Sequence, residues 1–311
     1  MSSIALFCSS QDIATDALAV GLLQREERGW GNSIQAVGGY LGAVIGSGML
    51  ILLNIWGWRT ALLAMASMML LALIPVLRHK EQQTKLSDRD FINPRQPETK
   101  STSAKSYLQT FTDFYRRPGM WRWLLILLVY PMAPYMGSTM FRPFLVDTGL
   151  SLAEIGLLVG GVSYTAGMLG AIVAGFVITF MGRKRSLVLF SLLEAIALAL
   201  YLLPAFSFTN LSILYLVAIS RQFALGMLRT AIYTIMMDKC DIATGGTDYT
   251  TQTSIAYLSA IIVAPISGIL AKTIGYRGLF VICVAIAMVS TAIIAKSFAY
   301  IKEQDRVLQE Q

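Results

Sequence analysis

The sequence predicts an all-α protein that crosses a membrane many times, and three observations lead to this prediction. Hydrophobic residues make up 55% of the 311 residues and charged residues only 14%, whereas soluble domains carry about 25% charged residues. Nine apolar segments are each about 20 residues or longer, enough to cross a hydrocarbon layer of about 30 Å as a helix. The character of these segments repeats in every third one. A bundle built from three-helix units follows from this pattern.

The nine segments are described in order along the chain. The first, fourth and seventh carry most of the polar side chains, and the third, sixth and ninth are almost uniformly apolar. The second, fifth and eighth carry small residues four apart, such as Gly167, Ala171 and Gly175, a spacing that lets two helices pack closely. Within lipid each segment must be helical, because its backbone polar groups have no other partners. The segments occupy residues 3–22, 33–54, 58–77, 122–146, 155–181, 186–206, 211–237, 252–273 and 278–298.

Composition and spacing also exclude several classes of function. The net charge is +7, but the basic residues gather in a few loops, which indicates membrane orientation rather than nucleic-acid binding. The only histidine, His79, lies in a polar loop, so we expect no metal site. Cys8, Cys240 and Cys283 are scattered, which favours unpaired thiols. No nucleophile can be matched with a base, so we expect neither an enzyme nor a cofactor.

The basic loops predict an orientation and a domain division. They follow the first, third and fifth segments and recur in the tail, and positively charged loops remain in the cytoplasm. We therefore expect a multi-pass protein of the inner, cytoplasmic membrane, with its C-terminus inside and its N-terminus outside. The expected parts are a three-helix N-terminal bundle at 1–77, a basic cytoplasmic linker at 78–121, a six-helix bundle at 122–299 and a cytoplasmic tail at 300–311.

An internal repeat predicts the size of the structural unit. Five residues of the second segment recur with the same spacing in the eighth: Gln35, Tyr40, Leu41, Ala43 and Ile45 correspond to Gln252, Tyr257, Leu258, Ala260 and Ile262. The tripeptide Gly57-Trp58-Arg59 likewise recurs as Gly275-Tyr276-Arg277. The second and third segments thus correspond to the eighth and ninth, so the unit has six helices. The chain holds one whole unit and the latter half of another, and we expect three further helices before it. Two six-helix halves form the plan of many secondary transporters.

Charged residues inside the apolar segments are the main functional candidates. Asp12 and Asp16 lie four apart on one face of the first segment, and Arg221 and Arg229 lie eight apart on nearly one side of the seventh. Each costs about 2.5–3.5 kcal/mol within lipid on insertion scales, so these groups should face a watery cavity or one another. Two interpretations stay open: structural ion pairs between the aspartates and the arginines, or proton transfer by an aspartate and anion binding by the arginines.

Further candidates lie near a predicted break in the fourth segment and in one loop. Tyr130-Pro131 and Pro134-Tyr135 indicate a broken helix that lines a cavity. Arg142, Gln35 and Gln252 complete the expected solute-binding set. For Glu194, in the sixth segment, we expect a structural partner. The loop residues Gly182, Arg183, Lys184 and Arg185 are either a positive anchor or a gating loop.

One stretch resembles a known family of carriers. Ser10-Gln11-Asp12-Ile13-Ala14-Thr15-Asp16-Ala17, followed by Glu27-Arg28-Gly29 and Gly31-Asn32-Ser33-Ile34-Gln35, resembles the AmpG-type branch of the major facilitator superfamily, which includes muropeptide, acetyl-CoA and siderophore permeases. Gly246-Thr247-Asp248-Tyr249-Thr250-x-Gln252 looks most like the siderophore permeases. The resemblance covers essentially the whole chain but lacks the family's first three helices. It implies that Asp12 and Asp16 line the cavity from the fourth family helix, and that Arg221 and Arg229 belong to the tenth.

The same resemblance bears on the loop. In the superfamily a D-x-x-G-R-K/R pattern forms a gating loop, and here Thr179 stands at its acidic position. The leading prediction is a monomeric, proton-coupled carrier in the bilayer that imports a medium-sized anionic solute, namely a siderophore or its iron complex. Asp12 or Asp16 would couple to protons, and Arg221, Arg229 and Arg142, with Tyr130, Tyr135, Gln35 and Gln252, would hold the solute. The alternatives are a muropeptide permease and a truncated, non-transporting remnant.

Overall fold

The computed structural model describes residues 2–78 and 111–309. The chain divides into two units, residues 1–44 with 111–311 and residues 45–110. Most of the predicted linker, including His79, lies outside the described residues, and residues 111–116 at its end are helical. The predicted division into 1–77, 78–121, 122–299 and 300–311 stays a prediction.

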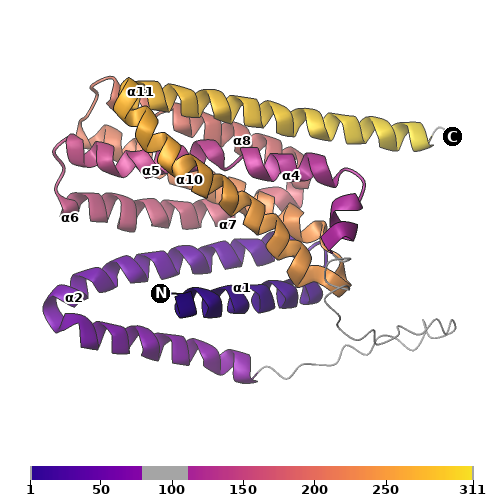
Figure 1. Ribbon diagram of the computed structural model, residues 1–311, viewed down its shortest axis with the longest axis horizontal. Coiled ribbons are helices and arrows are strands. Elements are labelled where there is room, and N and C mark those ends of the chain that lie inside the picture. The colour runs from indigo at the N-terminus through magenta and orange to yellow at the C-terminus, as the bar shows by residue number, and fades with distance from the viewer. Residues whose placement is uncertain (1, 79–110, 310–311) are drawn as a thin grey trace. The chain divides into compact units, whose positions relative to one another are not determined.

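The described residues are almost entirely helical and contain no strand (Figure 1). Each of the nine predicted segments is mainly helical. The all-α prediction is therefore confirmed. The elements are α1 (Ser2–Leu22), α2 (Arg28–Arg78), α4 (Met120–Val129), α5 (Met132–Asp147), α6 (Leu152–Ile155), η1 (Gly156–Ser163), α7 (Tyr164–Met181), α8 (Arg183–Ala199), α9 (Leu202–Ala205), α10 (Leu211–Asp238), η2 (Ile242–Thr244) and α11 (Gly245–Gln309).

Three glycines occupy the same place in successive groups of three segments. Gly57 (φ 74°, ψ 168°) lies within α2, Gly182 (φ 77°, ψ 163°) separates α7 from α8, and Gly275 (φ 71°, ψ 173°) lies within α11. Positive φ is accessible to glycine without the steric cost that a Cβ imposes. α2 and α11 are therefore each two helices, and Figure 1 shows the two arms of α11. The shared geometry supports the predicted three-segment repeat.

The predicted break in the fourth segment is present. α4 ends at Val129 and α5 begins at Met132, with Pro131 at the N-cap position of α5. Proline lacks an N–H group and clashes with the preceding turn, so the helical hydrogen bonds cannot run through this point. The break places Tyr130, Pro134 and Tyr135 at the same level of the bundle.

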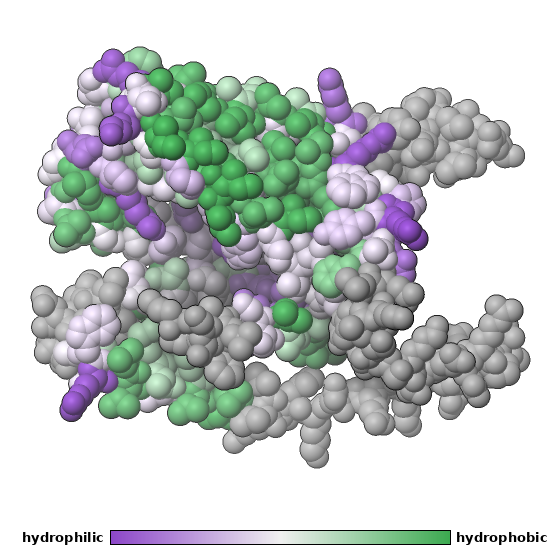
Figure 2. Space-filling view, in the orientation of Figure 1, coloured by the Kyte–Doolittle hydropathy of each residue, from purple (hydrophilic) through white to green (hydrophobic). Residues whose placement is uncertain are grey.

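Six stretches of the described chain are long and apolar enough to cross a membrane: 57–74, 120–147, 152–181, 183–205, 211–238 and 242–297. The stretch 242–297 contains both arms of α11, and α1 is not among the six stretches. Length and hydrophobicity in the structure therefore match the nine predicted crossings only roughly. α11 carries exposed apolar side chains such as Ile261, Ile269 and Val289. Figure 2 shows a continuous hydrophobic surface over this part, with hydrophilic residues toward its ends. Such a surface is suited to lipid.

The interior of the larger unit holds two apolar clusters. One includes Leu187 and Phe190 of α8 together with Met227 to Met237 of α10. The other includes Ala195 and Leu198 of α8 together with Leu214 to Ala218 of α10. Glu194 and Arg221 fall between the two clusters on these helices. The fold thus contains a polar layer between two apolar ones.

Helices α7 and α10 approach each other very closely. A Cβ atom added at Gly170 would lie 2.1 Å from the Phe223 carbonyl oxygen, and one added at Gly226 would lie 2.2 Å from the Gly167 carbonyl oxygen. Close packing predicted from the small residues of the fifth segment is therefore confirmed. It is not found in the second segment, where a Cβ at Gly38 or Gly42 would meet no atom within 4 Å.

Candidate solute-binding cavity

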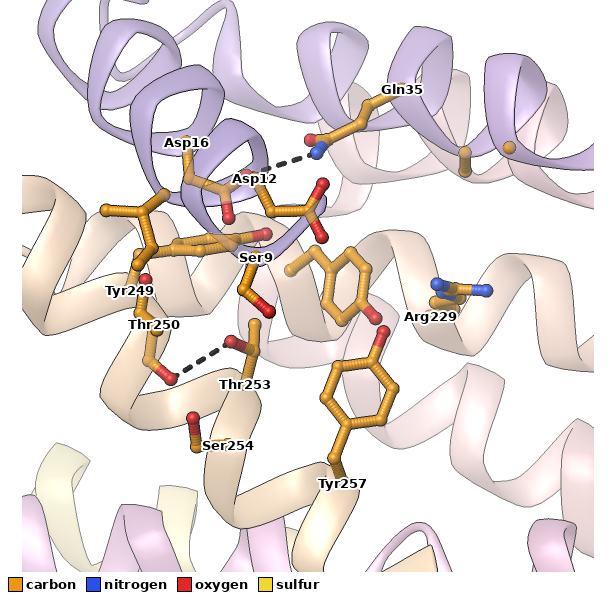
Figure 3. Close-up of a pocket in the computed structure, with 14 residues that line it drawn as sticks. Ser9, Asp12, Asp16, Gln35, Arg229, Tyr249, Thr250, Thr253, Ser254 and Tyr257 are labelled. Atoms are coloured by element: carbon orange, nitrogen blue, oxygen red, sulfur yellow. Dashed lines mark hydrogen bonds between the residues drawn. The ribbon is translucent and has the colours of Figure 1, made fainter. Parts of the chain in front are cut away.

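A polar cavity of about 360 Å³ lies among α1, α2, α10 and α11, within the larger unit (Figure 3). α1 and α2 come from the N-terminal part of the chain, and α10 and α11 come from the six-helix part. The cavity therefore lies where the predicted halves meet. It is lined by Ser9, Asp12, Ile13, Asp16, Gln35, Ala36, Gly39, Arg229, Tyr233, Tyr249, Thr250, Thr253, Ser254 and Tyr257.

One wall of the cavity is acidic. Asp12 and Asp16 lie one turn apart on α1, and Figure 3 shows both carboxylates on the cavity side of that helix. Asp16 is buried, and the Gln35 Nε2 donates a hydrogen bond of 3.3 Å to its Oδ1, whereas Asp12 is exposed. Within the described chain, neither carboxylate has a Lys or Arg nitrogen within 4.0 Å. The structural ion pairs that the sequence left open are therefore absent there.

The opposite wall carries a cation. Arg229 lies on α10, and its guanidinium carbon is 5.1 Å from the ring centre of Tyr233, one turn later. This is a cation–π contact, which holds the charge without neutralising it. Among the described residues, no carboxylate oxygen lies within 4.0 Å of Arg229. As far as residues 2–78 and 111–309 are concerned, the guanidinium on this wall has no carboxylate partner and the carboxylates on the opposite wall have no basic partner.

Hydroxyl groups of α11 form the third wall. Tyr249, Thr250, Thr253, Ser254 and Tyr257 lie within about two turns and face the cavity in Figure 3. Tyr249 is 2% exposed, and its hydroxyl has no hydrogen-bond partner within the described structure. Buried hydroxyls are normally hydrogen-bonded, so this group is available to a bound molecule.

A second, smaller cavity of about 120 Å³ adjoins the first. Arg229 and Tyr233 line both cavities, so these two side chains form the partition. The smaller cavity gathers Tyr130, Tyr135 and Arg221, which the sequence had singled out separately. Its complete lining is Tyr130, Pro131, Pro134, Tyr135, Ser138, Arg221, Leu225, Arg229 and Tyr233.

Arg221 differs from Arg229 because it has an acidic partner. Its Nε lies 3.3 Å from the Glu194 Oε1, and its Nη2 donates to the Pro134 carbonyl oxygen at 3.1 Å. Arg221 and Glu194 are each 2% exposed. The partner expected for Glu194 is thus found, and it is one of the two arginines expected to bind solute.

Two residues of the predicted solute-binding set line neither cavity. Arg142 donates a hydrogen bond of 3.3 Å to the Tyr164 hydroxyl. Gln252 is fully buried, accepts a 2.6 Å hydrogen bond from the Trp123 indole and donates to the Asp248 carbonyl at 3.2 Å. These contacts occupy the polar atoms of Gln252 within the bundle.

The predicted gating loop takes part in ion pairs at the end of α10. Arg183 pairs with Asp238, and Arg28 at the start of α2 pairs with the same carboxylate at 3.2 Å. Thr179, at the acidic position of the pattern, donates to the Gly175 carbonyl at 2.9 Å. Asp238 therefore supplies the carboxylate that Thr179 lacks, and the same carboxylate links α2 to α10.

Sequence reasoning missed the tyrosines that line the larger cavity. Tyr233 follows Arg229 by four residues, and Tyr249, Thr253 and Tyr257 are four apart, which places each set on one helical face. Polar residues at this spacing on an otherwise apolar helix indicate a face that lines a cavity, and this pattern could have identified the tyrosines from the sequence.

Comparison with known proteins decides the family. The family model described as "Major Facilitator Superfamily" matches residues 3–256 and, in an overlapping second match, residues 135–310. The chain belongs to the Major Facilitator Superfamily. It is 23% identical over 292 residues to the anhydromuropeptide permease of Escherichia coli K12, covering 93% of this chain and 57% of that protein. It is 26% identical over 297 residues to putative transporter AmpG 2 of Rickettsia felis, covering 90% and 66%.

A solved structure agrees on the fold. A bacterial homologue of the iron transporter ferroportin, in an outward-facing state, aligns with a TM-score of 0.62 at 15% identity, covering 94% of this chain and 69% of that chain. At this identity the likeness shows the fold alone. The relatives place the chain in the AmpG-like branch, as its sequence predicted. Neither is described as a siderophore permease, so that part of the prediction has no support from them. The chain spans about 57% of the length of the E. coli relative.

Proposed function

We propose that this multi-pass membrane protein imports an amphoteric sugar–peptide solute of the anhydromuropeptide class through the inner membrane. One observation carries the proposal. Within the part of the chain that the structure describes, the larger cavity opposes an arginine without a carboxylate partner, Arg229, to two aspartates without a basic partner, Asp12 and Asp16. A solute with both a carboxylate and an ammonium group would neutralise both walls. The similarity to an anhydromuropeptide permease supports the same class.

Arg229 would hold a carboxylate of the solute. A guanidinium binds a carboxylate through two parallel hydrogen bonds, and such a bond is stronger inside a protein than in water. A neutral solute would leave this cation without a partner. The aspartates of α1 would bind the ammonium group for the complementary reason.

The hydroxyl wall suits the sugar part of the solute. Tyr249, Thr253 and Tyr257 offer hydroxyls on one face of α11, and Tyr233 and Tyr257 also offer ring surfaces. Ligand sites commonly combine aromatic surface with a few polar groups that fix orientation. Cavities for small molecules measure about 300–1,000 Å³, so a cavity of about 360 Å³ would enclose one portion of a sugar–peptide and leave the rest outside.

Binding and uptake should be measured separately, because the chain spans 57% of its E. coli relative. Binding of a fluorescent anhydromuropeptide is measured on purified protein in detergent, and uptake on membrane vesicles that contain the protein. We expect Arg229→Gln to weaken binding at least tenfold, and Arg142→Gln, outside both cavities, to bind like the unchanged protein. Normal binding by Arg229→Gln would contradict the proposal. Binding without uptake would support the non-transporting alternative that the sequence left open.

A ferric siderophore and a neutral sugar serve as competitors in the same assay. The anhydromuropeptide should displace the fluorescent probe, whereas the neutral sugar should not. Displacement by the siderophore alone would favour the class first predicted from the sequence. Proton coupling through Asp12 or Asp16, and a cytoplasmic C-terminus, stay predictions. Uptake driven by an imposed pH gradient tests the first, and protease access to the C-terminus in sealed vesicles tests the second.

A further inference from the structure

A buried polar cluster lies between the two apolar clusters of the larger unit. Glu194 of α8 and Arg221 of α10 form its ion pair, and Tyr40 of α2 lies beside them with 5% of its surface exposed. Tyr40 packs on α7, where its ring carbons lie 2.8 Å from a Cβ built at Gly167. The cluster therefore joins the N-terminal part of the chain to the six-helix part.

The cluster has more hydrogen-bonding capacity than it uses. Both carboxylate oxygens of Glu194, the Nε and Nη1 of Arg221 and the hydroxyl of Tyr40 lack a hydrogen-bond partner within the described structure. Buried ion pairs are stable only when their remaining donors and acceptors are satisfied. Besides its Coulombic contact, this pair has one hydrogen bond within the described structure, from the Arg221 Nη2 to the Pro134 carbonyl oxygen. These atoms are therefore available to a molecule that enters the cluster.

The smaller cavity supplies room for such a group. Arg221 lines this cavity of about 120 Å³ together with Arg229, Tyr130, Tyr135 and Ser138. Two guanidinium groups and three tyrosines thus surround a space that fits a carboxylate and a few carbon atoms. Arg221 contacts both this space and Glu194, so a carboxylate in the cavity would compete with Glu194 for the same cation.

We propose that the smaller cavity is a carboxylate subsite, and that Glu194 yields Arg221 to a carboxylate of the solute while taking up one proton. The inference rests on the proposed function, which supplies a solute with carboxylates. One O–H bond forms on Glu194, from a solvent proton, and the Glu194–Arg221 ion pair is replaced by a solute–Arg221 ion pair. The anion and the proton enter together, so the net charge of the site is unchanged.

Glu194 is the group of this cluster that can accept a proton, because its charged neighbours are cations. A carboxylate that loses its cation in a dry interior is far less costly when it is protonated. Among the described residues, the other groups whose charge acts on this cluster are cations or side chains that are neutral at physiological pH, and none is a second carboxylate. They are Arg221, Arg229 and Tyr233 of α10, Tyr40 of α2, Tyr201 after α8, Cys283 of α11 and Arg142 of α5.

The test uses propionate, which carries the carboxylate alone, and propionamide, its neutral analogue. Purified protein in weakly buffered detergent solution is mixed with each probe, and proton uptake is measured with a pH-sensitive dye. We expect propionate to cause uptake of about one proton per bound molecule in the unchanged protein. Propionamide should cause none, and Glu194→Gln should abolish the uptake. Glu154→Gln, at an exposed carboxylate of α6 that lines neither cavity, should keep it.

Infrared difference spectra provide a second readout if Glu194→Gln does not fold. Propionate should produce the carbonyl band of a protonated carboxyl group in the unchanged protein, and Glu194→Asp should shift that band. Absence of propionate-dependent proton uptake, or equal uptake in Glu194→Gln, would overturn the proposal. An anhydromuropeptide that fails to bind while the propionate results hold would refute the proposed function and leave the subsite standing.

Discussion

The chain places carboxylates in two different surroundings, and the contrast separates their roles. Asp12 and Asp16 of α1 line the larger cavity without a basic partner within the described structure, whereas Glu194 of α8 lies between two apolar clusters and is paired with Arg221. A carboxylate beside a polar cavity can meet a bound solute directly. One paired in a dry interior can respond only through its partner. The presence or absence of a paired cation therefore separates the expected roles of these carboxylates.

Removing the cation from the paired acid should have the largest effect. Arg221→Ala leaves the Glu194 carboxylate buried and uncompensated, and breaking a buried pair from one side costs about 3–5 kcal/mol. Thermal unfolding in detergent should show a much lower midpoint for this variant. The double variant with Glu194→Gln should recover part of the loss, because the unpaired charge is then gone. A double variant no more stable than Arg221→Ala would mean that the pair does not account for the effect.

Removing the unpaired cation should affect binding and leave stability nearly unchanged. A hydrogen bond to a charged group contributes about 1.5–3 kcal/mol, so Arg229→Gln should weaken anhydromuropeptide binding by roughly ten- to a hundredfold. Its unfolding midpoint should stay close to that of the unchanged protein, since no carboxylate depends on Arg229. A marked fall in the midpoint would show that Arg229 has a structural role.

Neutralising the acids of α1 should discriminate between solutes. Asp12→Asn should weaken binding of an anhydromuropeptide with a free amino group by about tenfold, the loss of one charged interaction of about 1.4 kcal/mol. Binding of the N-acetylated analogue, which has no ammonium group, should be unchanged. If uptake of both solutes is lost while their binding persists, the aspartate couples transport to protons, as the sequence first indicated.

Releasing Asp16 from its hydrogen bond should have the smallest effect. Gln35→Ala removes the 3.3 Å hydrogen bond to the Asp16 carboxylate, and a bond of this kind contributes about 1 kcal/mol. Binding should therefore change less than tenfold. Gln252→Ala, at the repeat-related position, provides the comparison: it should destabilise the fold through loss of its bonds to Trp123 and Asp248 and leave the cavity unchanged.

Much of the fold was predictable, because hydrophobic length and proline or glycine positions act locally. The break at Tyr130-Pro131 and the equivalence of Gly57 and Gly275 were read from the sequence and confirmed. The site was only partly predictable, because it depends on which helices meet. Arg221 and Arg229 lie on nearly one face, yet eight residues correspond to about 12 Å along a helix, so the two reach different levels and different partners.

The internal repeat did not predict the contacts of Gln252. Gln35 and Gln252 are related by the duplication, but only Gln35 lines the larger cavity. Gln252 instead accepts a hydrogen bond from Trp123, a residue of α4. A repeat preserves the place of a residue in its unit, and the helices around that place decide its contacts.

The backbone contact between α7 and α10 has a mechanical consequence. Because the Gly170 and Gly226 positions have no space even for a methyl group, a relative shift that brought a larger residue into either contact would cause a clash. We expect α7 and α10 to move as one body in any rearrangement of the bundle. Asp238, which pairs with Arg183 of α8, ends α10, and Arg221 and Arg229 lie within the same helix. A displacement of α10 would therefore move both guanidinium groups together.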